Sequence, residues 1–390
     1  MCLKNGAMEK RLIVGLQYMK KKRLWKWTLI LFLLIVVAFT VTYFVLRYSS
    51  YEYAQIIKTH DNKSASNGNY VKYADGILEY SRDGIAMLTK EGEEIWNQPC
   101  QMGNPMAHTC KNAAVVADKG GTNIYVFQRD GLKGEIQTTR PIERVTVSSQ
   151  GIVAAILQNE AAPKIICYDA KGNILVELKA SLTGTGYPIA IDLSQDGNVL
   201  IVSYLSAKGN GASTNVTFYH FGENKEGNKN YQVAQKDYSD TIIPMINFVG
   251  KEQSLLVSDH SLIFYEGLEQ PEETQIVAVK KEIQSVAYDE EYIAMLLKNS
   301  KGTGHELLLY RMNGKKVMGV KVEGEYTDIK IEDGQVFLYD EKQCAIYNSS
   351  GVCKFEGALE MNILNIYPIT GLNKYMVISA NGFQEIQLAK

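Results

Sequence analysis

The feature that most restricts the fold of this chain is a short unit that recurs at a nearly constant spacing. Each copy is an apolar segment that ends in an aromatic residue or Leu, followed four residues later by Gly and then by a second apolar segment. The intervals between successive glycines are 39, 41 and, near the C-terminus, 37 residues, while the longer interval of 142 residues leaves room for two degenerate copies near 218–228 and 263–273. The five clear copies contain Leu88 and Gly92, Phe127 and Gly131, Tyr168 and Gly172, Tyr310 and Gly314, and Tyr347 and Gly351.

The apolar segments read as short β-strands separated by tight turns. Asp-Gly and Asn-Gly dipeptides, which favour hairpin turns, recur through residues 70–390, and no long window there has helical periodicity. The dipeptides begin at Asp75, Asp83, Asp130, Asp196, Asn313, Asp333 and Asn381. A period of about 40 residues with four short strands per repeat predicts an all-β fold, a β-propeller.

Eight repeats can be laid out along the chain, and the last of them is incomplete. They cover about 70–100, 104–140, 141–180, 187–236, 241–280, 281–322, 324–358 and 361–390, and the last supplies only three strands. Because an open ring leaves unpaired sheet edges, we expect the segment near 51–58 to supply the missing strand. We therefore predict eight four-stranded blades, with seven as the alternative number and an array of β-sandwiches as the alternative architecture.

An uncharged apolar run precedes the repeats. Residues 28–46 contain no charge, and 14 of these 19 residues are Leu, Ile, Val or Phe. A helix of that length spans roughly the hydrocarbon thickness of a bilayer, and Trp25, Trp27, Tyr43 and Tyr48 stand where interfacial aromatic residues are expected. No small-x-small cleavage site follows the run, which favours an uncleaved transmembrane helix over a cleaved signal peptide.

Charge is distributed unevenly about this run. Residues 1–27 carry eight Lys and Arg residues against Glu9, a net charge of +7, whereas residues 48–390 carry 32 basic and 42 acidic residues, a net charge of −10. The positive-inside rule predicts a cytoplasmic tail (1–27), a single-pass signal-anchor helix (28–46), and a connector (47–69) that leads to a propeller (70–390) outside the cell membrane. Met19 opens a second basic start, MKKKRLWKW, and is an alternative initiator. The acidic ectodomain argues against nucleic acid as a partner.

The ectodomain lacks the linear motifs of common catalytic and cofactor sites. No C-x-x-C, G-x-S-x-G or P-loop motif occurs, and the five histidines are not spaced as zinc ligands. The histidines are His60, His108, His220, His260 and His305. We therefore assign no metal, no cofactor and no catalytic residue from the sequence.

Cysteines and carboxylates leave two questions open. The ectodomain has an odd number of cysteines, which we interpret as reduced core side chains; Cys344 and Cys353 flank one predicted hairpin diagonally, so a disulfide between them stays open. Carboxylates are plentiful, and the channel of a propeller could gather a pair for glycoside chemistry, but nothing in the sequence selects that pair. The five cysteines are Cys100, Cys110, Cys167, Cys344 and Cys353.

Two segments rich in Gly, Asn and Lys, 205–215 and 222–240, interrupt the repeats and are predicted to be surface insertions. Loops on a rigid scaffold often carry binding sites, and a tolerated insertion without function is the alternative.

Several stretches resemble known repeat proteins. GEEIW (92–96) resembles the tryptophan-docking ending of quinoprotein-type repeats, and LSQDGNVL (193–200) resembles the S-x-D-G turn of WD-type repeats. A larger resemblance covers nearly the whole chain: the basic tail and span, then DGILEYSRDGIAMLTKEGEEIW, TTRPIERVTVSSQG, GYPIAIDLSQDGNVLIVSYL, VTFYHFG and GVCKFEG. This order resembles an uncharacterised family of single-pass membrane proteins with a propeller ectodomain from Gram-positive anaerobic bacteria. The resemblance implies fold, topology and source, and no functional residues.

These observations favour a non-catalytic binding or scaffolding module tethered to the membrane. Besides the lipid bilayer, we expect its partner to be an envelope protein or a cell-wall glycan. The alternative is an extracytoplasmic hydrolase or lyase acting on glycan through channel carboxylates.

Overall fold

The computed structural model describes residues 25, 27–45, 47–61, 68–159, 162–181, 184–208, 211–222, 231–299, 303–380 and 382–390. The chain divides into two compact units, Met1–Ser50 and Tyr51–Lys390. In the first unit, the helix Trp27–Val45 has a mean hydropathy of 2.7 and no buried residue, so its length and composition suit a transmembrane span or a signal anchor. The alternative start at Met19 lies outside the described residues.

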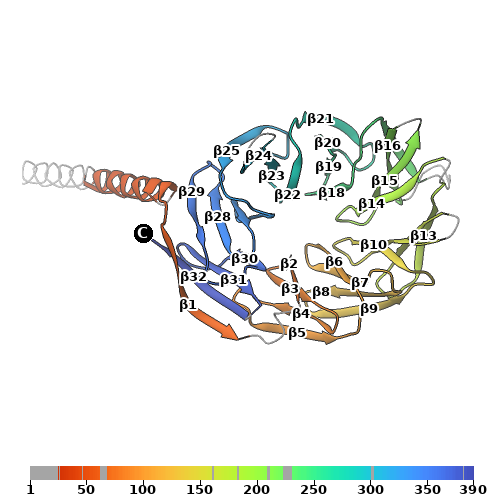
Figure 1. The fold of residues 1–390 in the computed structure, drawn as a ribbon, viewed down its shortest axis with the longest axis horizontal. Coiled ribbons are helices and arrows are strands. Elements are labelled where there is room, and N and C mark those ends of the chain that lie inside the picture. Colours follow the sequence, from red (N-terminus) through yellow and green to blue (C-terminus); the bar gives the residue numbers. More distant parts are fainter. Residues whose placement is uncertain are drawn as a thin grey trace, which may run out of the picture. The chain divides into compact units, whose positions relative to one another are not determined.

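The second unit is a β-propeller of eight four-stranded antiparallel sheets, which confirms the predicted number of blades. Figure 1 looks onto the ring, with the first strand of each blade toward its centre. Blades 1 to 4 consist of β2 (Asn69–Tyr73), β3 (Gly76–Tyr80), β4 (Gly84–Leu88) and β5 (Glu94–Pro99); β6 (Pro105–Cys110), β7 (Ala113–Asp118), β8 (Asn123–Gln128) and β9 (Gly131–Gln137); β10 (Ile142–Val147), β11 (Val153–Leu157), β12 (Lys164–Tyr168) and β13 (Ile174–Lys179); and β14 (Tyr187–Leu193), β15 (Val199–Lys208), β16 (Gly211–His220) and β17 (Gln232–Tyr238).

The remaining blades follow in chain order. Blades 5 to 8 consist of β18 (Met245–Val249), β19 (Gln253–Val257), β20 (Ser261–Glu266) and β21 (Glu272–Ala278); β22 (Ile283–Tyr288), β23 (Tyr292–Lys298), β24 (His305–Arg311) and β25 (Lys316–Val322); β26 (Asp328–Glu332), β27 (Gln335–Tyr339), β28 (Gln343–Asn348) and β29 (Cys353–Ala358); and β30 (Asn365–Pro368), β31 (Lys374–Ser379) and β32 (Gly382–Ala389), completed by β1 (Tyr53–Asp61).

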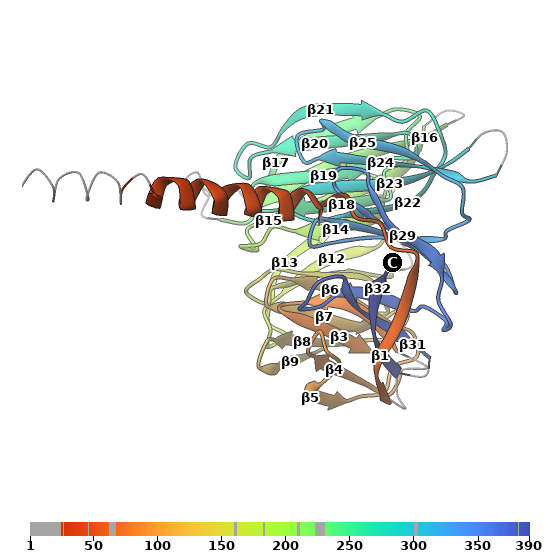
Figure 2. The same ribbon diagram turned by 90° about the vertical axis from the view of Figure 1, so that its left-hand side faces the viewer.

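The ring is closed by the pairing of its first and last strands, β1 and β32. Strand β1 pairs antiparallel with β32 along its whole length, from Tyr53 opposite Ala389 to Asp61 opposite Gly382. The two strands lie side by side in Figures 1 and 2. Without β1, strand β32 would be an open edge whose backbone N–H and C=O groups lack a protein partner. The closing strand therefore satisfies the backbone of the one blade whose own repeat is incomplete.

The core lies between neighbouring blades. The second and third strands are apolar along nearly their whole length and buried, as in β11, because both faces of a blade are covered. Outer strands such as β13 are largely exposed and alternate between exposed and half-buried residues. Each apolar cluster joins facing surfaces; Ala155 of blade 3, for example, packs with Val115 of blade 2.

The recurring sequence unit corresponds to one structural device, a β-bulge before the turn to the outer strand. In blades 1 to 7 the pairing register shifts near the end of the third strand. The shifts fall at Leu88, Phe127, Tyr168, Tyr219, Tyr265, Tyr310 and Tyr347. In blades 1 to 3 and 5 to 7 the glycine that follows has positive φ, as at Gly92 (86°) and Gly172 (86°), a conformation that glycine adopts without steric cost.

The predicted insertion at 205–215 is present in blade 4, but it is paired strand and not the loop that was expected. Strands β15 and β16 stay paired through this segment, from Leu205 opposite Thr214 to Lys208 opposite Gly211, so the hairpin of blade 4 is longer than its counterparts. Backbone pairing overrides the low strand propensity of Gly and Asn here. Part of the second predicted insertion, Gln232–Tyr238, is the outer strand β17, and 223–230 lie outside the described residues.

Trp96 fastens blade 1 to blade 2. Its indole stacks on Phe127 with ring centroids 4.9 Å apart and an interplanar angle of 6°, and its Nε1 donates to the carbonyl oxygen of Arg129 at 3.0 Å. The Arg129 guanidinium in turn donates two hydrogen bonds, of 2.9 and 2.7 Å, to the carboxylate of Asp75. The segment GEEIW thus docks a tryptophan onto the next blade.

Candidate functional site

The candidate site lies where the first strands of the blades surround the channel of the ring. A cavity of about 740 Å³ is bounded by β2, β6, β22, β26 and β30, and one of about 180 Å³ by β6, β14, β18 and β22. Both cavities are lined by Thr109, Lys111, Tyr288, Asp289 and Glu290, so they adjoin each other. The larger volume lies within the range of small-molecule sites in proteins.

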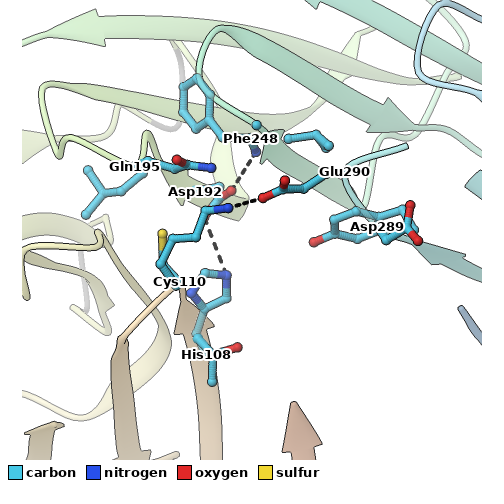
Figure 3. A pocket seen from close by; sticks show the side chains of 13 residues that line it. His108, Cys110, Asp192, Gln195, Phe248, Asp289 and Glu290 are labelled. Carbon is cyan, nitrogen blue, oxygen red and sulfur yellow. Dashed lines mark hydrogen bonds and ion pairs between the residues drawn. The ribbon is translucent and has the colours of Figure 1, made fainter. Parts of the chain in front are cut away.

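Asp192, on β14, ties four blades together beside the smaller cavity (Figure 3). Its carboxylate accepts hydrogen bonds from Thr146 Oγ1 of blade 3 at 2.6 Å and from the Phe248 backbone N–H of blade 5 at 2.7 Å, and it lies 3.5 Å from His108 Nε2 of blade 2. Burial raises the pKa of Asp192, against the lowering effect of His108 and of these hydrogen bonds. The residue thus draws together the inner strands on one side of the channel.

His108 and Cys110 lie two residues apart on β6, so the sheet geometry directs both side chains to one face. His108 Nδ1 lies 3.3 Å from the Val147 N–H, which donates to it, so Nε2 carries the proton that faces Asp192. Burial raises the pKa of the Cys110 thiol to about 11, with a further contribution from Asp192. A thiol with a raised pKa beside a histidine whose two nitrogens are engaged does not suit nucleophilic catalysis.

The other carboxylates that line the cavities are also engaged. Glu332 is buried and lies 2.6 Å from Lys72 Nζ, and Glu290 forms an ion pair with Lys111. Asp289 accepts hydrogen bonds from the N–H groups of residues 291 and 292 at 2.8 and 2.7 Å, which holds the turn between β22 and β23. Burial lowers the pKa of Lys72, but the hydrogen bond and charge of Glu332 outweigh burial and raise it overall.

Lys330 ties the inner strands of blades 7 and 8 at the wall of the larger cavity. Its Nζ donates to Asn365 Oδ1 and to the Ile366 carbonyl oxygen, both at 3.0 Å, and lies 2.9 Å from the centroid of the Tyr367 ring. Burial lowers the pKa of Lys330 well below its ordinary value. These two carbonyl partners and the ring face occupy the three donor directions of an ammonium group, so Lys330 stabilises the wall of the cavity.

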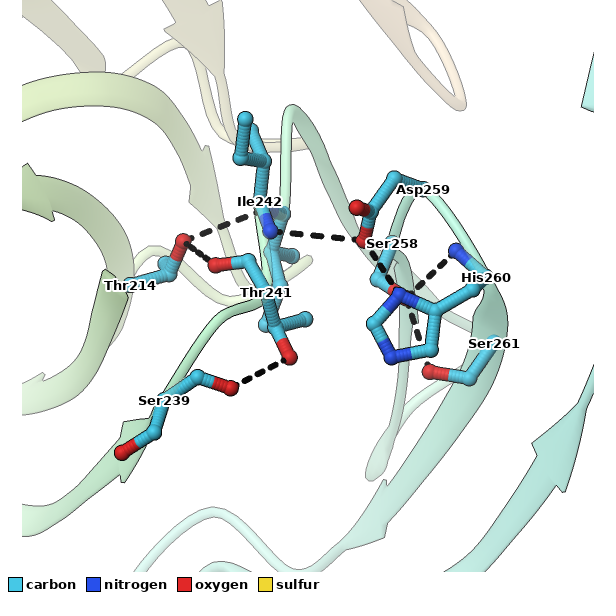
Figure 4. A network of polar contacts seen from close by, with 9 residues as sticks. Thr214, Ser239, Thr241, Ile242, Ser258, Asp259, His260 and Ser261 are labelled. Atoms are coloured by element: carbon cyan, nitrogen blue, oxygen red, sulfur yellow. Dashed lines mark hydrogen bonds and ion pairs between the residues drawn. The ribbon is translucent and has the colours of Figure 1, made fainter. Parts of the chain in front are cut away.

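A second polar network lies at the junction of blades 4 and 5 (Figure 4). Ser258, Asp259, His260 and Ser261 form the turn between β19 and β20, and His260 Nδ1 lies 2.6 Å from Asp259 Oδ1. This Ser–Asp–His sequence is not a catalytic triad, because Ser258 Oγ pairs with Ser261 Oγ at 2.7 Å and accepts the His260 backbone N–H at 3.2 Å. Asp259 also accepts the Ile242 N–H at 3.4 Å, so the turn fastens the loop that arrives from blade 4.

The cysteines and the other histidines do not assemble a site. The five cysteines of the propeller are free thiols, including Cys344 and Cys353. Within the residues that the structure describes, no group of three or more His, Cys, Asp or Glu side chains could hold a metal ion. Sequence reasoning missed the contact between His108 and Asp192, although both occupy first strands of their repeats, and that shared position was the available signal.

Comparisons with known proteins agree with this architecture. A family model described as "Family of unknown function (DUF5711)" matches residues 47–388. The chain belongs to this family. No curated protein matches it.

Two solved structures show the propeller fold of this DUF5711 member. A computationally designed protein, Ika8, is 11% identical with a TM-score of 0.56, and the C-terminal WD40 domain of Sif2 is 11% identical with a TM-score of 0.55. Each match covers 87% of this chain and 99% of the other. At this identity the likeness concerns the fold alone.

Proposed function

We propose that this DUF5711 protein is a non-catalytic binding or scaffolding module that a single N-terminal helix tethers to the membrane, with the propeller outside the cell membrane. One observation carries the binding role: a polar channel mouth bounded by first strands of five blades, in which the charged groups Lys72, Lys111, Glu290, Glu332 and Asp289 are held by protein partners. Such prearranged charges suit recognition of a ligand better than proton transfer.

The extracytoplasmic location is supported by the charge asymmetry about the helix. The tail of net charge +7 precedes the apolar run, and the ectodomain of net charge −10 follows it. Lys and Arg are retained on the cytoplasmic side of a span, whereas the acidic propeller has no comparable basic flank. An envelope protein or a cell-wall glycan is the partner that this location allows.

The binding role is tested by isolating the full-length chain from its native membrane in mild detergent, beside a Lys111→Glu variant. We expect the wild-type protein to retain a specific envelope protein or wall glycan that the variant loses. Equal recovery of the partner by both proteins would mean that the partner binds away from the channel mouth. Recovery of no partner would contradict the binding role.

One observation favours the alternative of a glycan-active hydrolase or lyase. Asp192 is a buried carboxyl with a raised pKa that lines the same cavity as Asp289 and Glu290, as a general acid beside a second carboxylate would. Incubation of the full-length protein with wall glycan, followed by a reducing-end assay, tests it. Release of sugar by wild type but not by Asp192→Asn would support the enzyme.

A further inference from the structure

The ion pair between Lys111 and Glu290 spans the mouth of the channel. Lys111 stands in the turn between β6 and β7 of blade 2, and Glu290 in the turn between β22 and β23 of blade 6. These blades are four positions apart in a ring of eight, so the pair joins opposite sides of the ring. Both residues line both cavities, which places the pair at the boundary between them.

The backbone holds each partner in place. Lys111 has a φ of 53°, in the left-handed region that costs a residue with a Cβ about 1 kcal/mol or more. The turn that carries Glu290 is fixed by Asp289, which accepts two backbone N–H groups. The side chains themselves are open to solvent, with exposed fractions of 49% for Lys111 and 66% for Glu290. Rigid turns thus present a solvated ion pair.

Besides Lys111, the described lining of the larger cavity has a second accessible lysine, Lys72, and one partly exposed carboxylate other than Glu290, namely Asp289. In the ion pair between Lys72 and Glu332, which lines the larger cavity, the Lys72 side chain is 53% exposed and the Glu332 side chain only 2%. The carboxylate is therefore part of the wall, and about half of the Lys72 side chain is accessible. If Glu290 turned out to solvent, Lys111 would lose its carboxylate partner, and the one partly exposed carboxylate left beside Lys72 and Lys111 in the described lining would be Asp289, whose Oδ1 is held by two backbone N–H groups.

We propose that Lys111 and Glu290 form a displaceable latch across the channel, and that the ligand of the larger cavity is a saccharide bearing an oxoanion, which replaces Glu290 on Lys111. The oxoanion is a carboxylate or a phosphate, the two anionic groups common to acidic glycans. This proposal rests on the proposed binding function and deepens it. An exposed ion pair contributes little to stability, so its replacement by an equivalent charge is nearly neutral and leaves the ring intact.

Substitution of Glu290 and substitution of Lys111 should change the affinity for the ligand in opposite directions. Glu290→Gln removes the internal competitor for Lys111 and should tighten binding about three- to fivefold. Lys111→Gln removes the cation and should weaken binding about tenfold or more. A pair that only held the turns together would give changes in the same direction for both substitutions.

The experiment is isothermal titration of the full-length protein in detergent micelles with three probes: digalacturonate, inorganic phosphate and lactose. We expect an oxoanion probe to bind and neutral lactose not to bind; digalacturonate alone would identify a carboxylate site on sugar, and phosphate alone a phosphate site. The matched control is Lys133→Gln, which should leave binding unchanged. Lys133, on β9, forms an exposed ion pair of 2.6 Å with Asp130, in the turn before that strand.

Two results would overturn the latch. One is that neither anionic probe binds wild type or Glu290→Gln; the other is that Glu290→Gln weakens binding as Lys111→Gln does. Either result leaves the proposed binding role standing if the native-membrane isolation still recovers a partner, so the two failures are distinguishable.

Discussion

At the scale of single residues, Tyr367 is one of the described side chains with a buried polar atom that has no hydrogen-bond partner. The residue is 1% exposed, and among the described residues its hydroxyl has no hydrogen-bond partner. On the neighbouring strand of the same blade, β31, Tyr375 is also buried, but its hydroxyl donates to Gln335 Oε1 at 2.7 Å. The two tyrosines therefore form a matched pair that differs in whether the hydroxyl is used.

Tyr367→Phe should leave the free energy of unfolding unchanged or raise it slightly, because the substitution removes a buried polar group without a protein partner. Tyr375→Phe should lower it by about 1 kcal/mol, because Gln335 loses its donor. Urea unfolding of the two variants measures both. If Tyr367→Phe lowered the free energy of unfolding as much as Tyr375→Phe, the Tyr367 hydroxyl would have a hydrogen-bond partner after all.

The ion pair of Asp75 with Arg129 should make the stability of the protein depend on pH. The hydrogen bonds from Arg129 lower the pKa of the Asp75 carboxyl below its unfolded value, so the ion pair contributes stability above the unfolded pKa. That contribution is lost as the pH falls through the folded pKa. The stability difference between wild type and Asp75→Asn should be small for so exposed a pair, full at neutral pH, and lost as the pH falls below about 4. A difference that persists in acid would mean that packing, and not charge, is responsible.

At the scale of elements, repeats predict strands well and loops poorly. The spacing of Leu88, Phe127 and Tyr168 from the glycines that follow them corresponds to a bulge and a tight turn. Both features depend on a few neighbouring residues, so the local sequence is enough to predict them. In blade 5 the glycine follows Tyr265 by two residues instead of four, so the unit was hard to recognise there. The long hairpin of β15 and β16 was predicted to be a loop, because Gly and Asn content is a weak guide to backbone pairing.

Contacts between blades are the part that the sequence does not reveal, and Gly134 shows why. A Cβ at this position of β9 would lie 1.7 Å from the carbonyl oxygen of Ala170 in the next blade, so only glycine allows the two backbones to approach. Nothing in the letters LKGEI distinguishes it from a turn glycine.

Gly134→Ala should therefore lower the free energy of unfolding by about 3 kcal/mol or more, since a backbone must move. The control is Gly334→Ala, where φ is 69° and no atom of the described residues lies within 4 Å of the new Cβ, so only about 1 kcal/mol should be lost. Thermal or urea unfolding of the pair decides it; equal losses would show that blades 2 and 3 are not packed as described.

At the scale of the whole molecule, the ring was predictable and the site was not. The sequence has eight repeats of about four strands each, and the last repeat is incomplete. These features predict a closed propeller without knowledge of any contact between residues. The candidate site gathers His108, Thr146, Asp192 and Phe248, which are separated in turn by 38, 46 and 56 positions. Because these intervals are unequal, the repeat period alone does not align the four residues.

We propose that the propeller, held by its helix, displays a binding surface outside the membrane. The most direct measurement is lysine crosslinking of intact cells with a membrane-impermeant reagent, followed by mass spectrometry. We predict crosslinks between an envelope component and propeller lysines beside the channel, Lys72 and Lys111 among them, and none from the lysines of the tail 1–27. Crosslinks from the tail, or a propeller that reacts only after the cells are broken, would contradict the account.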